Sequence, residues 1–205
     1  MCPPPKDGNE ALDRLLAGNR RFADGVENEV WRDTARRVEL AEGQNPFAVI
    51  LGCADSRVPP EVIFDQGLGE LFVVRVAGNT IAAPQVVGSI EFAVEEFGSV
   101  LVMVLGHERC GGVDGALTVV GEGGELPGAI ADVTAPIEPV VRRVQAEEPG
   151  LTGPELLDAC VRENARAVAA ELLERSETIA KLANAGGLEV LAAEYRLESG
   201  EVVLL

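Results

Sequence analysis

The sequence predicts an α/β fold in which a mostly parallel central sheet is flanked by helices. Three apolar runs, at 47–52, 71–76 and 100–105, lack the polar alternation of a half-exposed strand, which is typical of parallel strands that are covered on both faces. A helical pattern at 82–98 separates the last two runs, and a strand–helix–strand unit joins parallel strands. Because 47% of the 205 residues are hydrophobic, we expect one domain with a large core over 1–205.

The first part of the chain, 1–45, is expected to be a helical arm within this domain. In 9–23, apolar residues recur at near-helical spacing behind Asn9, whose side chain is of a type that caps helices. A second, more highly charged helix is expected over 28–42.

The middle of the chain alternates helices with breaks. The helix in 82–98 places its apolar residues on one stripe, and Gly98 is its stop signal. The glycine-rich stretch 119–128 predicts a loop. It does not resemble a nucleotide-binding loop, because no strand leads directly into it.

The C-terminal part is expected to contain helices and then a pair of strands. Helical patterns cover 129–147 and 153–184. The apolar segments 188–197 and 201–205 flank a turn at 198–200, which predicts a terminal strand pair.

The charge and cysteine content limit the classes of function. A net charge of −17, from 17 basic and 34 acidic residues, argues against binding to nucleic acid or to an anionic membrane, since both depend on positive patches. No apolar stretch reaches the roughly 20 residues of a membrane span, and no secretory signal is visible. Four cysteines in a chain of this length do not indicate a disulfide framework, so we expect a reducing, cytoplasmic location. We interpret Cys2 as an exposed thiol and Cys160 as part of the core.

Residues that bind metals follow two of the predicted strands. Cys53 comes just after the first strand, and Cys110 and His107, the only histidine, follow the third. The carboxyl ends of neighbouring parallel strands lie at one edge of a sheet, where ligand sites form. Thiolate and imidazole are zinc ligands, and three protein ligands leave the open position of a catalytic site. The sequence therefore predicts one Zn2+ per chain, although each residue alone is more often part of a core.

Asp55 and Arg57 follow Cys53 at every second position, so the three side chains would share one face of an extended segment. Asp55 could orient a zinc-bound hydroxide by accepting its hydrogen bond, while Arg57 holds the carboxylate off the metal by a bidentate pair. If that pair opened, Asp55 could occupy the free metal position and close the site. A structural salt bridge at a strand end is the alternative interpretation.

Two glycines after the last predicted ligand have a candidate role in binding an anion. Gly111 and Gly112 allow close approach of the backbone and would open the next helix, whose N-terminal amides favour an anion such as bicarbonate. An ordinary tight turn explains them equally well.

Several segments together resemble the bacterial branch of the β-class carbonic anhydrases. CADSR at 53–57 and GHERCGG at 106–112 carry the resemblance, and the segments 64–79 and 88–98 extend it over nearly the whole chain.

This resemblance implies both a reaction and an assembly. It implies zinc on Cys53, His107 and Cys110, the Asp55–Arg57 dyad as gate and orienter, and reversible hydration of CO2 to bicarbonate and a proton. It also implies a homodimer, often paired into a dimer of dimers, in which the N-terminal helices wrap around the partner. With the single histidine on zinc, the proton would leave through buffer or surface carboxylates.

Two further features of the family bear on this sequence. Some members have an active-site glutamine shortly before the second strand, and Gln66 lies close to that position. Members that bicarbonate inhibits at a non-catalytic site use a Trp, an Arg and a Tyr. Arg75 and Tyr195 match two of these, but Ile50 stands at the Trp position, so this inhibition is not implied here.

Three other functions agree with some of these features. An enzyme of the same fold could attack CS2 or COS, which the sequence does not distinguish from CO2. A non-catalytic zinc protein would keep the metal for stability, but it would not need an Asp55–Arg57 gate. A thiol-redox protein usually has a Cys-x-x-Cys motif, which the sequence lacks.

Overall fold

The computed structural model describes residues 4–26, 32–124 and 126–205, and in these residues a five-stranded sheet has the order β2-β1-β3-β4-β5. The strands are β1 (Ala48–Gly52), β2 (Leu71–Arg75), β3 (Leu101–His107), β4 (Glu189–Tyr195) and β5 (Val202–Leu204). Strands β2, β1, β3 and β4 are parallel, whereas β5 pairs antiparallel with β4. The predicted fold class is confirmed, including the C-terminal strand pair.

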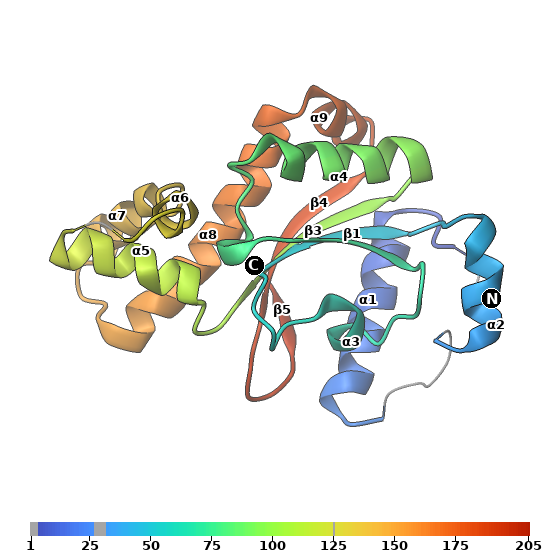
Figure 1. Cartoon of the computed structure of the whole chain (residues 1–205), viewed down its shortest axis with the longest axis horizontal. Coiled ribbons are helices and arrows are strands. Elements are labelled where there is room, and N and C mark those ends of the chain that lie inside the picture. The colour runs from blue at the N-terminus through green and yellow to red at the C-terminus, as the bar shows by residue number, and fades with distance from the viewer. Residues whose placement is uncertain (1–3, 27–31, 125) are drawn as a thin grey trace.

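Helices flank this sheet on both faces (Figure 1). They are α1 (Gly8–Ala23), α2 (Thr34–Glu39), η1 (Leu40–Glu42), α3 (Pro60–Ile63), η2 (Ala77–Asn79), α4 (Pro84–Phe97), α5 (Gly111–Glu122), α6 (Ile130–Thr134), α7 (Glu138–Glu147), α8 (Gly153–Arg175) and α9 (Glu177–Asn184). Among the described residues, none of these helices is both long and apolar enough to span a membrane.

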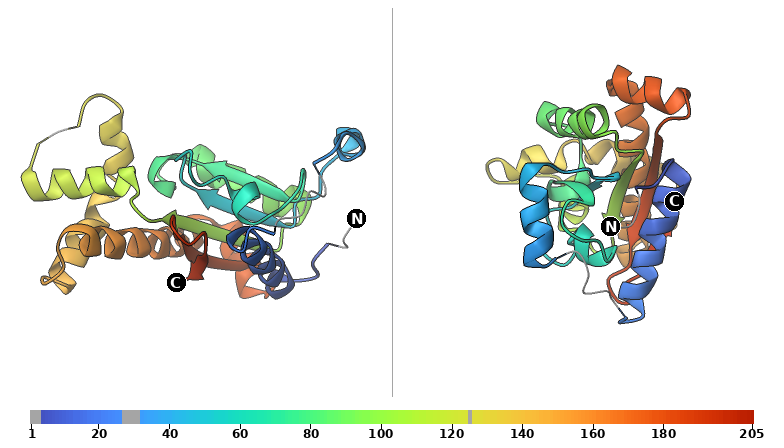
Figure 2. Two further views of the ribbon diagram at one scale, coloured as in Figure 1. Left: turned by 90° about the horizontal axis from the view of Figure 1, so that it is seen from below. Right: turned by 90° about the vertical axis from the view of Figure 1, so that its right-hand side faces the viewer.

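The core is centred on β1 and β3, in which every residue is buried. These strands are buried because each has a paired neighbour on both sides and helices on both faces. Ile50 and Met103 belong to an apolar cluster that includes α1 and α3, whereas Val49 and Val102 belong to a second cluster with α4, α8 and α9. Figure 1 shows α4 and α9 on one side of the sheet and α1 and α3 on the other, and Figure 2 gives the same arrangement from two further directions. The helices α5, α6 and α7 lie beyond the carboxyl ends of the parallel strands.

The N-terminal helix differs from its prediction in its cap. Asp7, not Asn9, is the cap of α1, because the Asp7 carboxylate accepts a hydrogen bond from the main-chain N–H of Glu10 at 2.9 Å. The second predicted helix, 28–42, is confirmed only in part as α2 and η1, and its first residues lie outside the described chain.

Three other boundaries also differ from the sequence prediction. The predicted loop 119–128 is wrong at its start, since α5 continues to Glu122. The predicted helix 129–147 is two helices, because Pro136 lies between α6 and α7 and cannot continue a helix. The predicted helix 153–184 ends at Arg175 and restarts after Ser176, whose hydroxyl accepts the N–H of Ile179 at 3.1 Å and so caps α9.

Candidate metal centre

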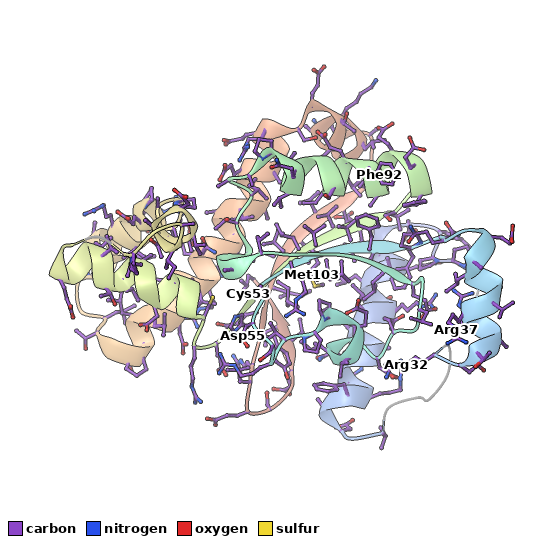
Figure 3. All side chains as sticks on the ribbon, viewed as in Figure 1. Arg32, Arg37, Cys53, Asp55, Phe92 and Met103 are labelled. Carbon is purple, nitrogen blue, oxygen red and sulfur yellow. The ribbon has the colours of Figure 1, made fainter. Side chains whose placement is uncertain are left out.

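Two adjacent strands bring the predicted metal ligands together. β1 ends at Gly52 and Cys53 follows it, while His107 is the last residue of β3 and Cys110 directly precedes α5. Because β1 and β3 are parallel, with Gly52 opposite Leu105, their carboxyl ends meet at one edge of the sheet. Figure 3 shows Cys53 and Asp55 at this edge.

The three ligand atoms form one compact, buried group. The donor atoms of Cys53, His107 and Cys110 all lie within 4.8 Å of one another, and the two sulfurs are 3.9 Å apart. The three residues are only 5%, 1% and 1% exposed, respectively. This grouping agrees with the sequence prediction that the two strand ends form a single site.

The geometry of the group fits a metal ion. Two thiolates on a tetrahedral zinc, each about 2.3 Å from it, lie about 3.8 Å apart. The sulfurs of Cys53 and Cys110 have nearly that separation, 3.9 Å. His107 Nδ1 lies 2.8 Å from the carbonyl oxygen of Glu108, and a proton on Nδ1 leaves Nε2 as a metal ligand. Within the described chain, the buried Nε2 atom has no hydrogen-bond partner.

The surroundings of the two thiols favour a negative charge on Cys53 and disfavour one on Cys110. The hydrogen bond with Cys110 lowers the pKa of Cys53, and the nearby His107 ring and the main-chain N–H groups of Asp55 and Gly78 act in the same direction. The contact with Cys53, together with burial, raises the pKa of Cys110. The two thiols thus favour one thiolate between them, and a bound cation would release the second proton.

Asp55 and Arg57 form the bidentate pair that their spacing predicts. Arg57 Nε donates to Asp55 Oδ1 at 2.9 Å, and Arg57 Nη2 donates to Oδ2 at 2.7 Å. The main-chain N–H of Arg57 adds a third bond to Oδ1, at 2.9 Å. These bonds from Arg57 hold the pKa of the Asp55 carboxyl well below its usual range. Arg57 Nη2 also donates to the carbonyl of Arg109 at 3.3 Å, so the pair bridges to the segment that carries Cys110.

The two glycines at the start of α5 have different surroundings. A Cβ on Gly112 would lie 3.0 Å from the N and Cα atoms of Gly78, whereas a Cβ on Gly111 would meet nothing within 4 Å. The close approach predicted for this pair of glycines is therefore present at Gly112, and Gly111 opens α5 as expected.

Gln66 is held by hydrogen bonds to residues outside the metal group. Its buried side-chain amide donates to the main-chain carbonyl of Phe64 at 2.7 Å, and the main-chain carbonyl of Gln66 accepts from Arg32 Nη2 at 3.3 Å. It lines a surface hollow together with Val62 and Leu68. A role for Gln66 in the active site of this chain stays a prediction.

Arg75 contacts the main chain of residues 53–55, which follow β1. The spacing of residues in the sequence did not predict this contact. Arg75 Nε donates to the carbonyl of Cys53 at 2.8 Å, and its Nη2 donates to the carbonyl of Asp55. The signal in the sequence was a charged residue at the end of an otherwise apolar strand, beside the strand that leads to Cys53.

Comparison with known proteins gives one consistent result. A sequence model described as carbonic anhydrase matches residues 48–202. Carbonic anhydrase 2 of Mycobacterium tuberculosis is 40% identical over 190 residues, which cover 93% of this chain and 89% of that protein. A carbonic anhydrase of Mycolicibacterium smegmatis is 37% identical over the same length and coverage.

Solved structures with the same fold belong to carbonic anhydrases too. The β-carbonic anhydrase CcaA superposes with a TM-score of 0.77 at 29% identity, covering 95% of this chain and 94% of that chain. Tetrameric β-carbonic anhydrases from Sordaria macrospora give a TM-score of 0.77 at 25% identity, covering 95% and 96%. With the Cys-His-Cys group at the edge of the same sheet, these matches show that the chain belongs to the β-carbonic anhydrases.

Proposed function

We propose that this protein uses zinc to hydrate CO2 reversibly to bicarbonate and a proton, with Asp55 and Arg57 as its catalytic dyad. The observation that carries the proposal is the buried group of Cys53, His107 and Cys110 next to a carboxylate that Arg57 keeps ionised. A metal site that served only to stabilise the fold would not need an ionised carboxylate beside it.

The three ligands determine which metal ion fits the site and how strong a Lewis acid that ion would be. Two thiolates and one imidazole are a common ligand set for zinc. Zinc held by such residues supplies a Lewis acid that lowers the pKa of water and so provides a nucleophile near neutral pH. The negative charges of Cys53 and Cys110 offset the metal's charge, so we expect maximal activity above neutral pH.

Asp55 is suited to accept a hydrogen bond from the attacking water. A carboxylate oxygen offers about two lone-pair directions. Oδ1 of Asp55 already accepts two bonds from Arg57, whereas Oδ2 accepts one. One direction on Oδ2 therefore remains for the nucleophile. Because Arg57 lowers the pKa of Asp55, the carboxylate orients the water and is a poor acceptor of its proton.

The proton that the reaction produces must leave without a histidine. His107 is the only histidine of the sequence, and its Nε2 atom is assigned to the metal. Buffer molecules and surface carboxylates are then the acceptors, which makes proton transfer the slow step at low buffer concentration.

We also propose that the active form is a homodimer, which can pair into a tetramer. Val62 and Leu68 are large apolar side chains that are 42% and 44% exposed beside Gln66. The related proteins from Sordaria macrospora are described as tetrameric, which supports a multimer. Sedimentation of the zinc-loaded protein would test this; a monomer at assay concentration would contradict it. The cytoplasmic location and the single domain over 1–205 stay predictions.

Cysteine variants with a matched control test the zinc assignment. Cys53→Ala should lose the bound zinc and CO2 hydration together. Cys160→Ala removes another fully buried cysteine, and because Cys160 is not in the metal group it should keep both. Zinc retained by Cys53→Ala would contradict the ligand set. Zinc bound by the wild type without CO2 hydration would favour CS2 or COS as substrate, or a structural metal.

A further inference from the structure

Arg75 joins the end of β2 to the segment that carries the catalytic groups. It lies opposite Gly52 in the β1–β2 register. Gly52 is the last residue of β1, and the segment that begins with Cys53 follows it directly. The Arg75 guanidinium donates to the carbonyls of Cys53 and Asp55, which are the two carbonyls on either side of Ala54.

The main chain provides two more bonds at the same place. The N–H of Val76 donates to the carbonyl of Gly52 at 3.1 Å, and the N–H of Ala54 donates to the carbonyl of Val76 at 3.2 Å. Beyond Ala54 this ladder ends. The guanidinium of Arg75 adds bonds to the carbonyls of Cys53 and Asp55, which these two main-chain bonds do not use.

Asp55 is consequently held at both ends. Arg75 holds its carbonyl, and Arg57 holds its carboxylate by two side-chain bonds. Cys53 is fixed by the same guanidinium through its own carbonyl. One rigid, planar group thus fixes the main chain from which the Cys53 sulfur and the Asp55 carboxylate project.

We propose that Arg75 is a positioning residue, which orients the Cys53 thiolate and the Asp55 carboxylate relative to each other through the main chain, and that it is not an anion receptor in this protein. The inference rests on the proposed zinc-dependent function. It extends that function to a residue that touches neither the metal ligand atoms nor the dyad's carboxylate oxygens.

The three residues matched to the bicarbonate site of inhibited relatives argue against such a role for Arg75 in this chain. Ile50, which stands where inhibited relatives have a Trp, is 0% exposed and packed in the core. Tyr195 is 5% exposed and packs near the ring of Phe22, with 6.4 Å between centroids. Nε and Nη2 of Arg75 are occupied by carbonyls.

The direct test is Arg75→Ala, measured by CO2 hydration and by zinc competition with a chelator. Partners that orient metal ligands typically contribute about 10- to 100-fold in affinity or activity. We expect kcat to fall by about that factor with KM nearly unchanged, and zinc affinity to fall by about 10-fold. Added guanidinium, at a concentration that leaves the fold intact, should restore part of kcat, whereas ammonium should not.

Two further variants show whether an effect of Arg75→Ala comes from lost positioning, from the lost charge or from a general loss of stability. Arg75→Lys keeps the charge but cannot reach both carbonyls with one planar group, so it should recover little of kcat. Arg175→Ala is the matched control, because Arg175 Nη1 also donates to a main-chain carbonyl, that of Ile81, at 2.5 Å. It should leave kcat and zinc affinity unchanged. If Arg75→Ala does not fold, Arg75→Lys supplies the same two measurements.

Three results would overturn the inference. One is wild-type kcat and zinc affinity in Arg75→Ala, and another is full recovery of both in Arg75→Lys. The third is inhibition of the wild type by bicarbonate that Arg75→Ala relieves, which would identify an anion receptor. If the wild type binds zinc but does not hydrate CO2, the proposed function fails, while weaker zinc binding in Arg75→Ala still supports the positioning role.

Discussion

Replacing Asp55 with Asn gives the sharpest test of the dyad. The substitution keeps the size of the side chain but leaves one oxygen where the carboxylate has two. Arg57 donates to both oxygens, so the Asn amide must turn its NH2 group toward one of the donors or lose a bond. No acceptor then remains for the attacking water, and the negative charge is gone.

The expected loss follows from one hydrogen bond to a charged group. Such a bond contributes about 1.5–3 kcal/mol, and about 1.4 kcal/mol corresponds to a factor of ten in rate. We therefore expect Asp55→Asn to lower kcat/KM by about 10- to 160-fold. Zinc content should stay at the wild-type level, because the carboxylate is not one of the three clustered ligands.

Stopped-flow CO2 hydration with zinc-loaded protein measures this loss. Glu163→Gln is the control, since it removes one carboxylate from an arginine pair, with Arg143 at 2.5 Å, that includes no metal ligand. It should have wild-type kcat/KM. If Asp55→Asn keeps kcat/KM within about threefold of the wild type while zinc remains bound, Asp55 has no orienting role.

Three other predictions concern packing, thiol reactivity and proton release. Gly112→Ala should lower the free energy of unfolding by about 1–3 kcal/mol, since its Cβ would meet the backbone of Gly78; urea unfolding would measure this, and an equal loss in Gly111→Ala would contradict it. Burial raises the pKa of Cys160 to about 11, so a thiol reagent at about pH 8 should leave it unmodified in the folded protein and modify it in urea; mass spectrometry would detect early modification, which would contradict this. With His107 as the only histidine, kcat should rise with buffer concentration at fixed pH, and a rate independent of buffer would contradict the absence of an internal shuttle.

The sheet could be predicted because its strands have a simple physical signature. β1 and β3 are buried on both faces, so their sequences are uninterrupted apolar runs. The end of α4 was equally predictable, because Gly98 adopts a left-handed φ of 65° that other residues adopt at a cost. These features depend on local sequence, and the tertiary structure does not override them.

Helix breaks were harder to predict than strands. The apolar spacing over 153–184 continues across Ser176, so periodicity alone does not reveal that α8 ends there. The break depends on a side-chain contact, since the Ser176 hydroxyl donates to Glu91 on α4 at 2.6 Å. Contacts between distant segments leave no local pattern in a sequence.

The metal centre likewise has parts that the sequence predicts and parts that depend on contacts between distant segments. Cys53, His107 and Cys110 could be grouped in advance, because parallel strands place their carboxyl ends together. Arg75 could be matched only through family resemblance, since its partners in the structure are main-chain carbonyls. Any residue at 53 or 55 offers such a carbonyl, so residue types do not reveal the contact.

CO2 hydration by the zinc-loaded wild type, before and after removal of the metal with a chelator, tests the central claim most directly. We expect rapid hydration that increases above neutral pH, disappears when zinc is removed and returns when zinc is added back. One zinc per chain without hydration at any pH would contradict the proposed reaction, although the metal site itself would stand.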